Sequence, residues 1–507
     1  MIIEPGTSVS CIKNFTSEVE DLLSGKLQYT NKSVSYQVKR HVDNRDRILW
    51  VLRHKGYTTK EAGEIWQKEI EDLKSQIKVH LIKKKDEMLI FPAGLTERVI
   101  ALLTKNHISF VIEDRRVKPT TLHQWPIQTS SLNLRPYQKE AVQALLSKGQ
   151  ATMVGGTGIG KTACFQAITH QLGLKTVIVV PSISIFHQTI RRFEKYFGKS
   201  LVGTFGDGKK KPKDITICVA RSLSDSDSSI WKGTDLLIAD ECHHAPADTL
   251  KRIAFQKIPD AFYRFSFTAT PYRADGGNLM IEGVSFPTAY EYTVKRGIQE
   301  GYLAEPIFTC FRLKKTSGTY SGSDPMKAYQ SHILDNKFLN ERAINIATVL
   351  AGQGLKILIM VKEKDHGHLL HGSLPNATFL RTRETPAERS RIERIYKHYA
   401  PFVDDQEGVD EFNAGRVPIL IGTSIIGEGT DLIPVDAQLI LTGGLSQSSI
   451  VQMVGRSLRT GAENPFEGKR HVHIMDFICE GHPLLEKHAL ERMDYYRELG
   501  TVEECPL

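Results

Sequence analysis

The sequence predicts an α/β protein with two parallel-sheet domains in tandem, preceded by a small α+β domain. Short runs rich in β-branched residues alternate with helical patterns over residues 132–300, and the alternation resumes after a polar stretch at 314–324. This pattern is typical of βαβ units, whose strands form a parallel sheet covered by helices. The predicted strands are KTVIVV, DITICVA, DLLIAD and FYRFSFTAT in the first sheet, then LKILIMV, ATFL, VPILIGT, AQLILTG and HVHIMDF in the second.

The N-terminal part of the chain has a different pattern. A polar, charged segment is followed by LIKKKDEMLIFPAGLTERVIALLTKNHISFVIED, which predicts strand, turn, strand, helix and strand, with Pro92 and Gly94 as breaks. Residues 118–131 have the composition of a linker, and KKTSGTYSGSD at 314–324 that of a flexible connection. The expected domains are residues 1–125, 132–305 and 325–507. The last predicted element is a helix, PLLEKHALERMDYYREL.

Composition excludes some protein classes. No apolar run approaches the roughly 18 residues of a membrane span, and the first residues lack the pattern of a signal peptide. The seven cysteines are scattered without a CxxC pair, which argues against a disulfide framework or a zinc site and suits a reducing cytosol. The net charge of +8 is compatible with a polyanionic partner. We therefore expect a cytoplasmic protein.

The segment GGTGIGKT at 155–162 fits the pattern G-x-x-x-x-G-K-[ST], with a predicted strand before it and a helix after it. Gly155 and Gly160 would let the backbone turn tightly and direct N–H groups at phosphates. Lys161 would reach the β- and γ-phosphates of ATP, and Thr162 would bind Mg²⁺. The remaining predicted loop residues at the nucleotide are Gly156, Thr157 and Gly158. The alternative is a glycine-rich turn without a ligand.

An acidic pair follows the predicted strand DLLIAD. Asp240 would lie at the carboxyl end of the sheet, where α/β proteins bind ligands, and would hold Mg²⁺. Glu241 would polarise the attacking water. His243 is a candidate sensor of the γ-phosphate, although a capping or core role is also open for it and for His244. Taken alone, an acidic pair at a strand end is most often a solvated turn, but the phosphate loop in the same predicted sheet favours the catalytic interpretation.

The segment FSFTATPYR supplies two hydroxyls at the end of another predicted strand. Thr268 and Thr270 are candidates for coupling the γ-phosphate site to the rest of the protein, and Pro271 forces a turn after them. A threonine-rich strand end is the alternative.

In this order, GGTGIGKT, DECHH and TATP resemble motifs I, II and III of superfamily 2 helicases. The resemblance extends over residues 132–480 and implies two RecA-like domains that use ATP. LRPYQKEAV resembles the Q motif, in which Gln138 would contact the adenine edge while Arg135 or Tyr137 stacks on the ring. The other matching segments are VVPSISIFHQ (motif Ia), ITICVARSL (Ic), LKILIMVKEKDH (IV), IGTSIIGEGTDL (V) and QMVGRSLR (VI). Gly429 and Asp431 of motif V would lie at the nucleotide.

Motif VI contains two arginines three residues apart, a spacing that predicts a shared helix face. An arginine that reaches the γ-phosphate stabilises the charge of the transition state, an effect of roughly 10³–10⁵ in rate in other systems. By the family's pattern, Arg459 is this arginine finger and Arg456 is a second γ-phosphate contact. Gln452, one turn earlier, would order the water or bridge the motifs.

Shorter segments, including TATPYR, GEGTDL and HIMDFICEGHPLL, resemble the phage UvsW type of helicase. This resemblance implies remodelling of branched DNA in a bacterial cytoplasm, with Holliday junction migration, fork regression and unwinding of D-loops and R-loops. DNA contacts would go mainly to the phosphate backbone. The candidates are Ser182, Arg221, Ser222, Lys362, Thr423 and Ser424.

Other basic and aromatic residues leave alternatives open. The lysines at 83–85 and the run KKKPK at 209–213 could contact phosphates or form solvated basic turns. Trp66 and Trp125 could stack on bases, but burial is the favoured interpretation.

Three rival functions also remain. They are an RNA helicase, a double-stranded DNA translocase without strand separation, and a clamp that only binds ATP. Glu241, Arg456 and Arg459 argue against the clamp, because a clamp does not need the groups that hydrolyse ATP.

Overall fold

The computed structural model describes residues 1–119, 123–128, 132–156, 158–241, 247–269, 277–313, 318–423, 426, 432, 434–444, 447–461 and 464–506. The chain divides into two compact units. The first contains residues 1–154, 163–186 and 190–291, and the second contains residues 155–162, 187–189 and 292–507. The predicted class is confirmed, with two RecA-like parallel sheets and a small α+β part at the N-terminus.

The N-terminal part is built on a five-stranded sheet with the order β5-β6-β2-β1-β7. Its strands are β1 (Ile2–Glu4), β2 (Val9–Lys13), β5 (Lys83–Lys85), β6 (Met88–Pro92) and β7 (Val111–Ile112), with helices α1 (Ser17–Lys26) and α5 (Thr96–Lys105). Alternate residues such as Ile12 and Phe91 point into one core with Leu103 of α5. The predicted order of strand, turn, strand, helix and strand is confirmed by β5, β6, α5 and β7.

This sheet packs against α11 (Asn278–Ser285) of the same unit. Met280 of α11 belongs to the core of the N-terminal part. A Cβ atom on Gly94 would lie 2.1 Å from the carbonyl oxygen of Glu282, so only glycine allows this approach. Arg98 donates two hydrogen bonds to Glu282, from Nε at 2.9 Å and from Nη2 at 2.6 Å. The N-terminal sheet and α11 therefore form a continuous packed structure.

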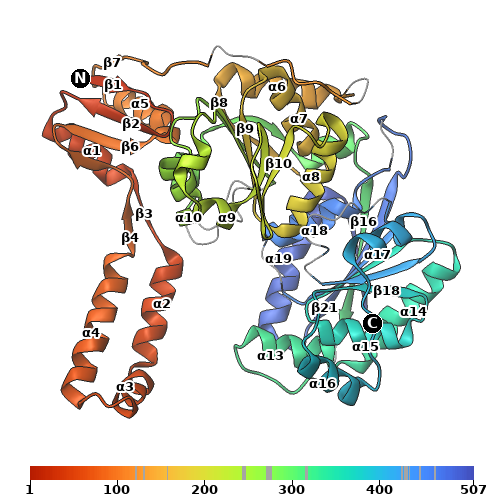
Figure 1. The fold of residues 1–507 in the computed structure, drawn as a ribbon. Coiled ribbons are helices and arrows are strands. Elements are labelled where there is room, and N and C mark those ends of the chain that lie inside the picture. Colours follow the sequence, from red (N-terminus) through yellow and green to blue (C-terminus); the bar gives the residue numbers. More distant parts are fainter. Residues whose placement is uncertain are drawn as a thin grey trace. The chain divides into compact units, whose positions relative to one another are not determined.

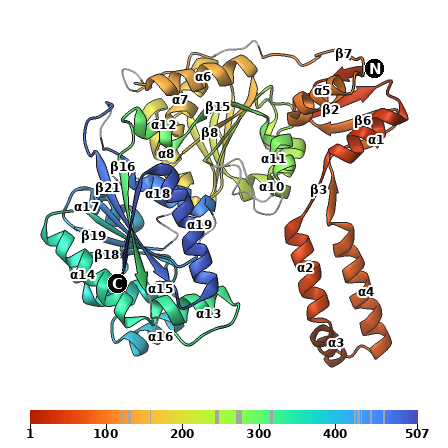
Figure 2. The same ribbon diagram turned by 180° about the vertical axis from the view of Figure 1, so that it is seen from behind.

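Residues 31–77, which we call the arm, form helices that extend from this sheet on a two-stranded ribbon (Figures 1 and 2). The ribbon pairs β3 (Gln28–Thr30) with β4 (Lys78–His80), and the helices are α2 (Lys32–Asp43), α3 (Arg45–His54) and α4 (Thr59–Ser75). Thr58 and Glu61 form a capping box at the start of α4, with the Glu61 carboxylate 2.8 Å from Thr58 N. Sequence analysis left this segment unassigned, although the T-x-x-E spacing was a usable helix signal.

The first RecA-like sheet has eight strands in the order β11-β10-β12-β9-β13-β14-β8-β15. They are β8 (Gln150–Gly155), β9 (Thr176–Val180), β10 (Val202–Gly206), β11 (Lys209–Lys211), β12 (Ile215–Val219), β13 (Leu236–Asp240), β14 (Tyr263–Thr268) and β15 (Thr288–Tyr292). The neighbouring pairs from β10 to β8 are all parallel. The carboxyl ends of these strands therefore share one edge. The associated helices are α6 (Pro136–Lys148), α7 (Lys161–Leu172), α8 (Ile183–Phe197), α9 (Ala220–Ser224) and α10 (Ala247–Arg252). The next helix, α12 (Val294–Gln299), belongs to the second unit, where Val294 packs in the core.

The second RecA-like sheet has seven strands in the order β18-β19-β17-β20-β21-β16-β22, and every pair is parallel. They are β16 (Glu305–Leu313), β17 (Ile357–Val361), β18 (Ala377–Leu380), β19 (Ile419–Gly422), β20 (Ala437–Leu441), β21 (His471–Cys479) and β22 (Thr501–Pro506). Ile357 and Ile359 pack in one core, while Leu358 and Met360 pack in the other. Burial on both faces explains the continuous apolar run of this strand.

The helices of the second unit follow these strands closely. They are α13 (Pro325–Tyr329), α14 (Lys337–Gly352), α15 (Lys364–Ser373), α16 (Pro386–Tyr396), α17 (Asp405–Asn413), α18 (Gln447–Ser457) and α19 (Pro483–Leu499). Across the described residues of both units, no helix has the length and apolar composition required to cross a membrane.

Two expectations for the second sheet are wrong. β16 precedes the polar stretch at 314–324 but pairs with β21 along its whole length, so this stretch does not connect the two sheets. Its described part is held in place, with the Thr319 N–H donating to Ser331 Oγ at 3.0 Å. The predicted last helix is α19, but β22 follows it and pairs with β16. These strands lack a β-branched run, which is why the pattern missed them.

Candidate functional site

The predicted phosphate loop connects β8 to α7. Gly158 and Gly160 have φ angles of 92° and 80°, a region that favours glycine. Ile159 between them is buried and anchors the loop. The Lys161 ammonium lies 3.5 Å from the carbonyl oxygen of Gly155, so it folds back over the loop. The loop therefore has the tight turns that bring backbone N–H groups together.

One glycine was assigned the wrong role. Gly155 is the last residue of β8 and has no positive φ, so the turn depends on Gly158 and Gly160. Gly156 is small for a different reason, because a Cβ atom there would lie 2.6 Å from Cγ2 of Val294.

The loop fits ATP with Mg²⁺ by its shape and by its donor groups. The helix α7 begins at Lys161, and helix N-termini favour phosphate through their unpaired N–H groups and dipole. Thr162 offers a hydroxyl, and Asp240 offers a carboxylate at the end of β13. Oxygen donors of this kind are those that Mg²⁺ prefers, usually with one or two protein ligands plus substrate phosphates.

The acidic pair is connected to the next strand. Glu241 has φ 45°, an uncommon conformation for a residue with a side chain, and its N–H donates to Asp240 Oδ1 at 3.0 Å. The backbone N–H of Ala269 donates to Glu241 Oε2 at 3.2 Å. Thr268, the last residue of β14, is 1% exposed. The end of β14 thus fixes the predicted catalytic carboxylate through a backbone group, which no side-chain pattern could have revealed.

The Q-motif residues lie at the start of α6. The side-chain oxygen of Gln138 accepts a hydrogen bond from Arg135 N at 2.8 Å, and the residue is buried. Tyr137 is 1% exposed and accepts a hydrogen bond from Arg135 Nη1 at 3.2 Å. Because the tyrosine ring is packed in the core, Arg135 is the better of the two candidates for stacking on adenine.

The motif VI residues do not share a helix face as expected. α18 ends at Ser457, so Arg456 lies in its last turn while Arg459 lies beyond it, in a bridge with Leu303. Gln452 and Arg456 are both buried and lie one turn apart on the helix. Lys469 supports the helix end, since its ammonium donates to the carbonyl oxygen of Ser457 at 2.7 Å. Burial lowers the pKa of Lys469 to about 8.

Arg459 lies beside the phosphate loop, which packs with the second unit. A Cβ atom on Gly158 would lie 3.2 Å from Cγ of Arg459 and 3.4 Å from the carbonyl oxygen of Gly455. Because α18 ends at Ser457, Arg459 lies outside the helix, and its side chain lies next to Gly158 of the loop.

The predicted DNA contacts of the first unit follow strands at the same sheet edge. Ser182 follows β9 and caps α8, its hydroxyl accepting from Ile185 N at 3.4 Å. Arg221 and Ser222 follow β12 in α9, and Arg221 is exposed. Because β9 and β12 are parallel neighbours, these residues gather at one edge.

The predicted contacts of the second unit are similarly placed. Lys362 follows β17, and Thr423 follows its parallel neighbour β19. Tyr329, which sequence analysis missed, fixes Lys362. Its hydroxyl accepts from Lys362 N at 3.1 Å, and its ring lies 5.4 Å from the Lys362 ammonium.

The hydroxyl of Tyr329 also lies 2.7 Å from Nδ1 of His366. Nε2 of His366 lies 2.7 Å from Oδ1 of Asn340, which can only accept, so this nitrogen carries the proton and Nδ1 accepts from Tyr329. Burial lowers the pKa of His366 to about 3, which keeps the ring neutral. The network is a closed chain of hydrogen bonds that supports the predicted contact.

Several predicted residues fall outside the described part of the chain. They are Thr157, His243, His244, Thr270, Pro271, Ser424, Gly429 and Asp431. The lysines of β5 and of β11 are exposed. Trp125 is 8% exposed, which confirms burial, and Trp66 is partly buried against His41, with ring centroids 6.3 Å apart.

Two family models match the chain. Residues 131–273 match the res subunit of type III restriction enzymes, and residues 340–461 match the helicase conserved C-terminal domain. The two matches contain the described loop, the acidic pair and α18. The first match contains β8 to β14 of the first RecA-like sheet, and the second contains β17 to β20 of the other.

Curated relatives with similar sequences are named as a DNA translocase and as putative helicases. The DNA 3'-5' translocase XPB2 of Sulfurisphaera tokodaii is 24% identical over 366 residues, covering 66% of this chain and 80% of the relative. The putative ATP-dependent helicase IRC3 of Saccharomyces cerevisiae is 27% identical over 381 residues, covering 68% of this chain and 51% of the relative. The chain thus spans about half the length of this second relative.

Solved structures show weaker similarity. The crystal structure of T4 UvsW is 14% identical, with a TM-score of 0.43 and coverage of 100% of both chains.

Proposed function

Because the chain is an ATP-dependent helicase of superfamily 2, we propose that it couples ATP hydrolysis to movement along DNA and remodels branched DNA. The observation that carries the motor role is the position of Arg459 beside the turn of the phosphate loop. Remodelling would include Holliday junction migration, fork regression and unwinding of D-loops and R-loops. The names of the relatives, a DNA translocase and putative DNA helicases, support DNA as the substrate.

The hydrolysis step is assigned to five groups of this chain. Lys161 binds the β- and γ-phosphates, and Glu241 orients the water that attacks the γ-phosphate. Thr162 and Asp240 would hold Mg²⁺, which neutralises charge on the phosphates when it is bound. Arg459 stabilises the charge that develops on the γ-phosphate.

Two further residues of motif VI support this step, because Arg456 and Gln452 lie on the same helix, α18. We assign Arg456 to a second γ-phosphate contact and Gln452 to the ordering of the water. Both are buried, so their positions are set by packing rather than by solvent.

The bond from Ala269 to Glu241 connects hydrolysis to the end of β14. A change in the γ-phosphate would move Glu241 and hence the segment that follows Thr268. We assign Thr270 and His243, which neighbour these groups in the sequence, to the same coupling role. This gives the motor a route from chemistry to movement.

DNA would bind along the strand-end residues, mainly through its backbone. Ser182, Arg221 and Ser222 would contact it in one RecA-like domain, and Lys362, Thr423 and Ser424 in the other. The N-terminal domain, residues 1–125, would engage the branch. The packing of this domain against α11 supports the assignment, because DNA bound to the N-terminal domain would move together with the first RecA-like sheet.

A second candidate is a double-stranded DNA translocase that does not separate strands. The relative from Sulfurisphaera tokodaii is named a translocase, which favours this alternative. ATP hydrolysis alone does not distinguish the two functions, because both consume ATP on duplex DNA.

The test measures ATP hydrolysis and strand products on a four-way DNA junction, a fork, blunt duplex, single-stranded DNA and single-stranded RNA. The Lys161→Ala variant is the matched control. Preference for the junction and fork, lost in the variant, is the expected result. ATP hydrolysis on duplex DNA without strand products would favour the translocase. Stimulation of ATP hydrolysis by RNA alone would indicate that RNA, and not DNA, is the substrate.

A further inference from the structure

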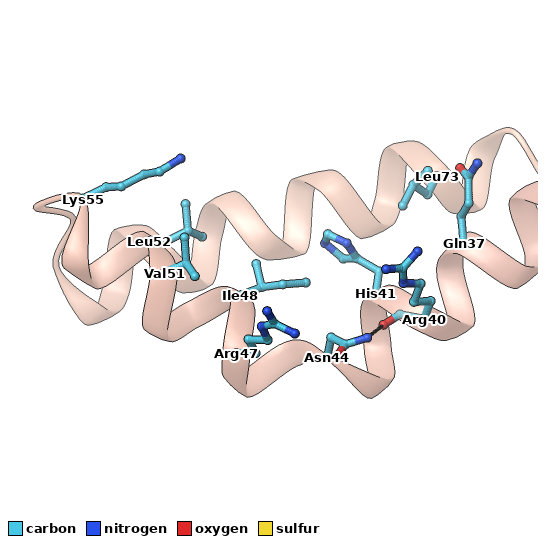
Figure 3. Close-up of a pocket in the computed structure, with 10 residues that line it drawn as sticks. All are labelled: Gln37, Arg40, His41, Asn44, Arg47, Ile48, Val51, Leu52, Lys55 and Leu73. Carbon is cyan, nitrogen blue, oxygen red and sulfur yellow. Dashed lines mark hydrogen bonds between the residues drawn. The ribbon is translucent and has the colours of Figure 1, made fainter. Parts of the chain in front are cut away.

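The helices of the arm enclose a surface groove. A cavity of about 620 Å³ runs along α2 and α3 (Figure 3). Its floor is apolar, with Ile48 and Leu52 of α3 pointing toward the neighbouring helix, which contributes Leu73. Val51, 39% exposed, continues the apolar surface. The groove lies outside the residues assigned to ATP hydrolysis and to the strand-end contacts.

The arm is poorly packed for a helical structure. Among its described helices, α2 buries Val34, α4 buries Ala62 and Ile70, and α3 buries no residue. Residues 41, 44, 48, 52 and 55 line the groove at intervals of three or four, so the seam runs along one side of α2 and α3. An antiparallel helix pair with such an open seam can be completed by a third amphipathic helix, as in a helical bundle.

The charged side chains that line the cavity have one sign. Arg40, Arg47 and Lys55 line the cavity, and its lining contains no aspartate or glutamate. Within the described residues, neither Arg40 nor Arg47 takes part in an ion pair. Residues 32–55 contain seven lysines and arginines but two aspartates, whereas residues 58–76 contain five acidic residues and three lysines. The groove is therefore cationic on the side of α2 and α3.

We propose that this groove binds an acidic amphipathic helix of a partner protein. The apolar face of that helix packs on Ile48, Leu52 and Leu73, and its flanking carboxylates pair with Arg40 and Arg47. Such a helix would contact both the apolar floor and the arginines beside it. A nucleic acid backbone would satisfy the arginines but has no apolar face to cover the floor.

The test measures binding of labelled peptides to the full-length protein by fluorescence anisotropy. The probe is a 20-residue helix with leucines at i, i+3, i+4 and i+7 spacing and glutamates on its flanks. One control peptide has lysines in place of the glutamates, and another has serines in place of the leucines. A 20-base-pair duplex DNA is the competing probe. The protein variants are Arg40→Glu/Arg47→Glu and, as a matched control outside the groove, Lys60→Glu/Lys68→Glu.

The acidic amphipathic peptide is expected to bind, and the groove variant to weaken it by roughly tenfold or more, with no change in the control variant. Hydrogen exchange should show protection of residues 37–55 when the peptide is bound. Equal binding of the lysine or serine peptides, or an unchanged affinity in the groove variant, would overturn the proposal. So would DNA binding that depends on Arg40 and Arg47 while the peptide does not bind, or self-association of the protein through the arm.

Discussion

The hydroxyl of Tyr329 offers a direct test of how the Lys362 segment is held. Tyr329→Phe keeps the ring but removes the donor to His366 Nδ1 and the acceptor for Lys362 N, at 2.7 and 3.1 Å. His366 is fully buried. An unpaired buried acceptor costs about 1–3 kcal/mol, and the weakened Lys362 bond adds about 0.5–1.5 kcal/mol. The expected loss of unfolding free energy is therefore about 1.5–4.5 kcal/mol. A cavity adds almost nothing to it, because the phenyl ring has nearly the same volume as the tyrosine side chain.

Urea unfolding of the full-length protein measures this loss, and hydrogen exchange at the Lys362 amide shows whether it is local. Tyr36→Phe is the matched control, because Tyr36 is 68% exposed and should change stability by less than about 0.5 kcal/mol. In a double-mutant cycle with His366→Leu, the two changes should not add. A Tyr329→Phe protein as stable as the parent, with the Lys362 amide still protected, would refute the closed network.

Three other perturbations follow from the described contacts. Gly94→Ala places a methyl group against the carbonyl oxygen of Glu282 and should weaken the packing of the N-terminal part on α11. Limited proteolysis should then release the N-terminal part faster than in the parent protein. An unchanged digestion pattern would contradict this packing. Arg459→Lys should lower kcat for ATP hydrolysis roughly 10³-fold while KM changes little. An unchanged kcat would contradict the assignment of Arg459 as the arginine finger. Burial lowers the pKa of His366 to about 3 and of His368 to about 4, so the folded state binds fewer protons than the unfolded state below pH 6.5. The free energy of unfolding should therefore be fully retained above pH 6.5 and be lower by about 2 kcal/mol per histidine at pH 5. Urea unfolding curves above pH 6.5 and at pH 5 measure the difference.

The sheets were predictable where burial on both faces leaves a continuous apolar run. ILIMV of β17 is such a run, and it was assigned correctly. β16 escaped because its sequence, EPIFTCFRL, is interrupted by proline, cysteine and arginine and precedes a polar stretch. Its position in the sheet is determined by pairing with β21, a contact that no local pattern contains.

For the candidate site, local motifs predicted which residues take part but not their geometry. The spacing of Arg456 and Arg459 predicted a shared helix face, yet the helix ends at Ser457. Likewise, the loop glycine that adopts an unusual turn is Gly158 rather than Gly155. Ala269 acts through a backbone N–H, so its side chain gives no signal.

The arm is inserted between strands of the N-terminal part in such a way that another segment could replace it. The chain leaves and returns through adjacent strands, with Thr30 paired to Lys78 and the Asn31 N–H donating to Ile77 O at 2.8 Å. A short hairpin turn could therefore join β3 to β4 directly, since antiparallel neighbours need only a two-residue connection. Recombination or design could replace or remove the whole arm without redirecting the chain. A binding role of the arm, as proposed above, could thus change independently of the two RecA-like sheets.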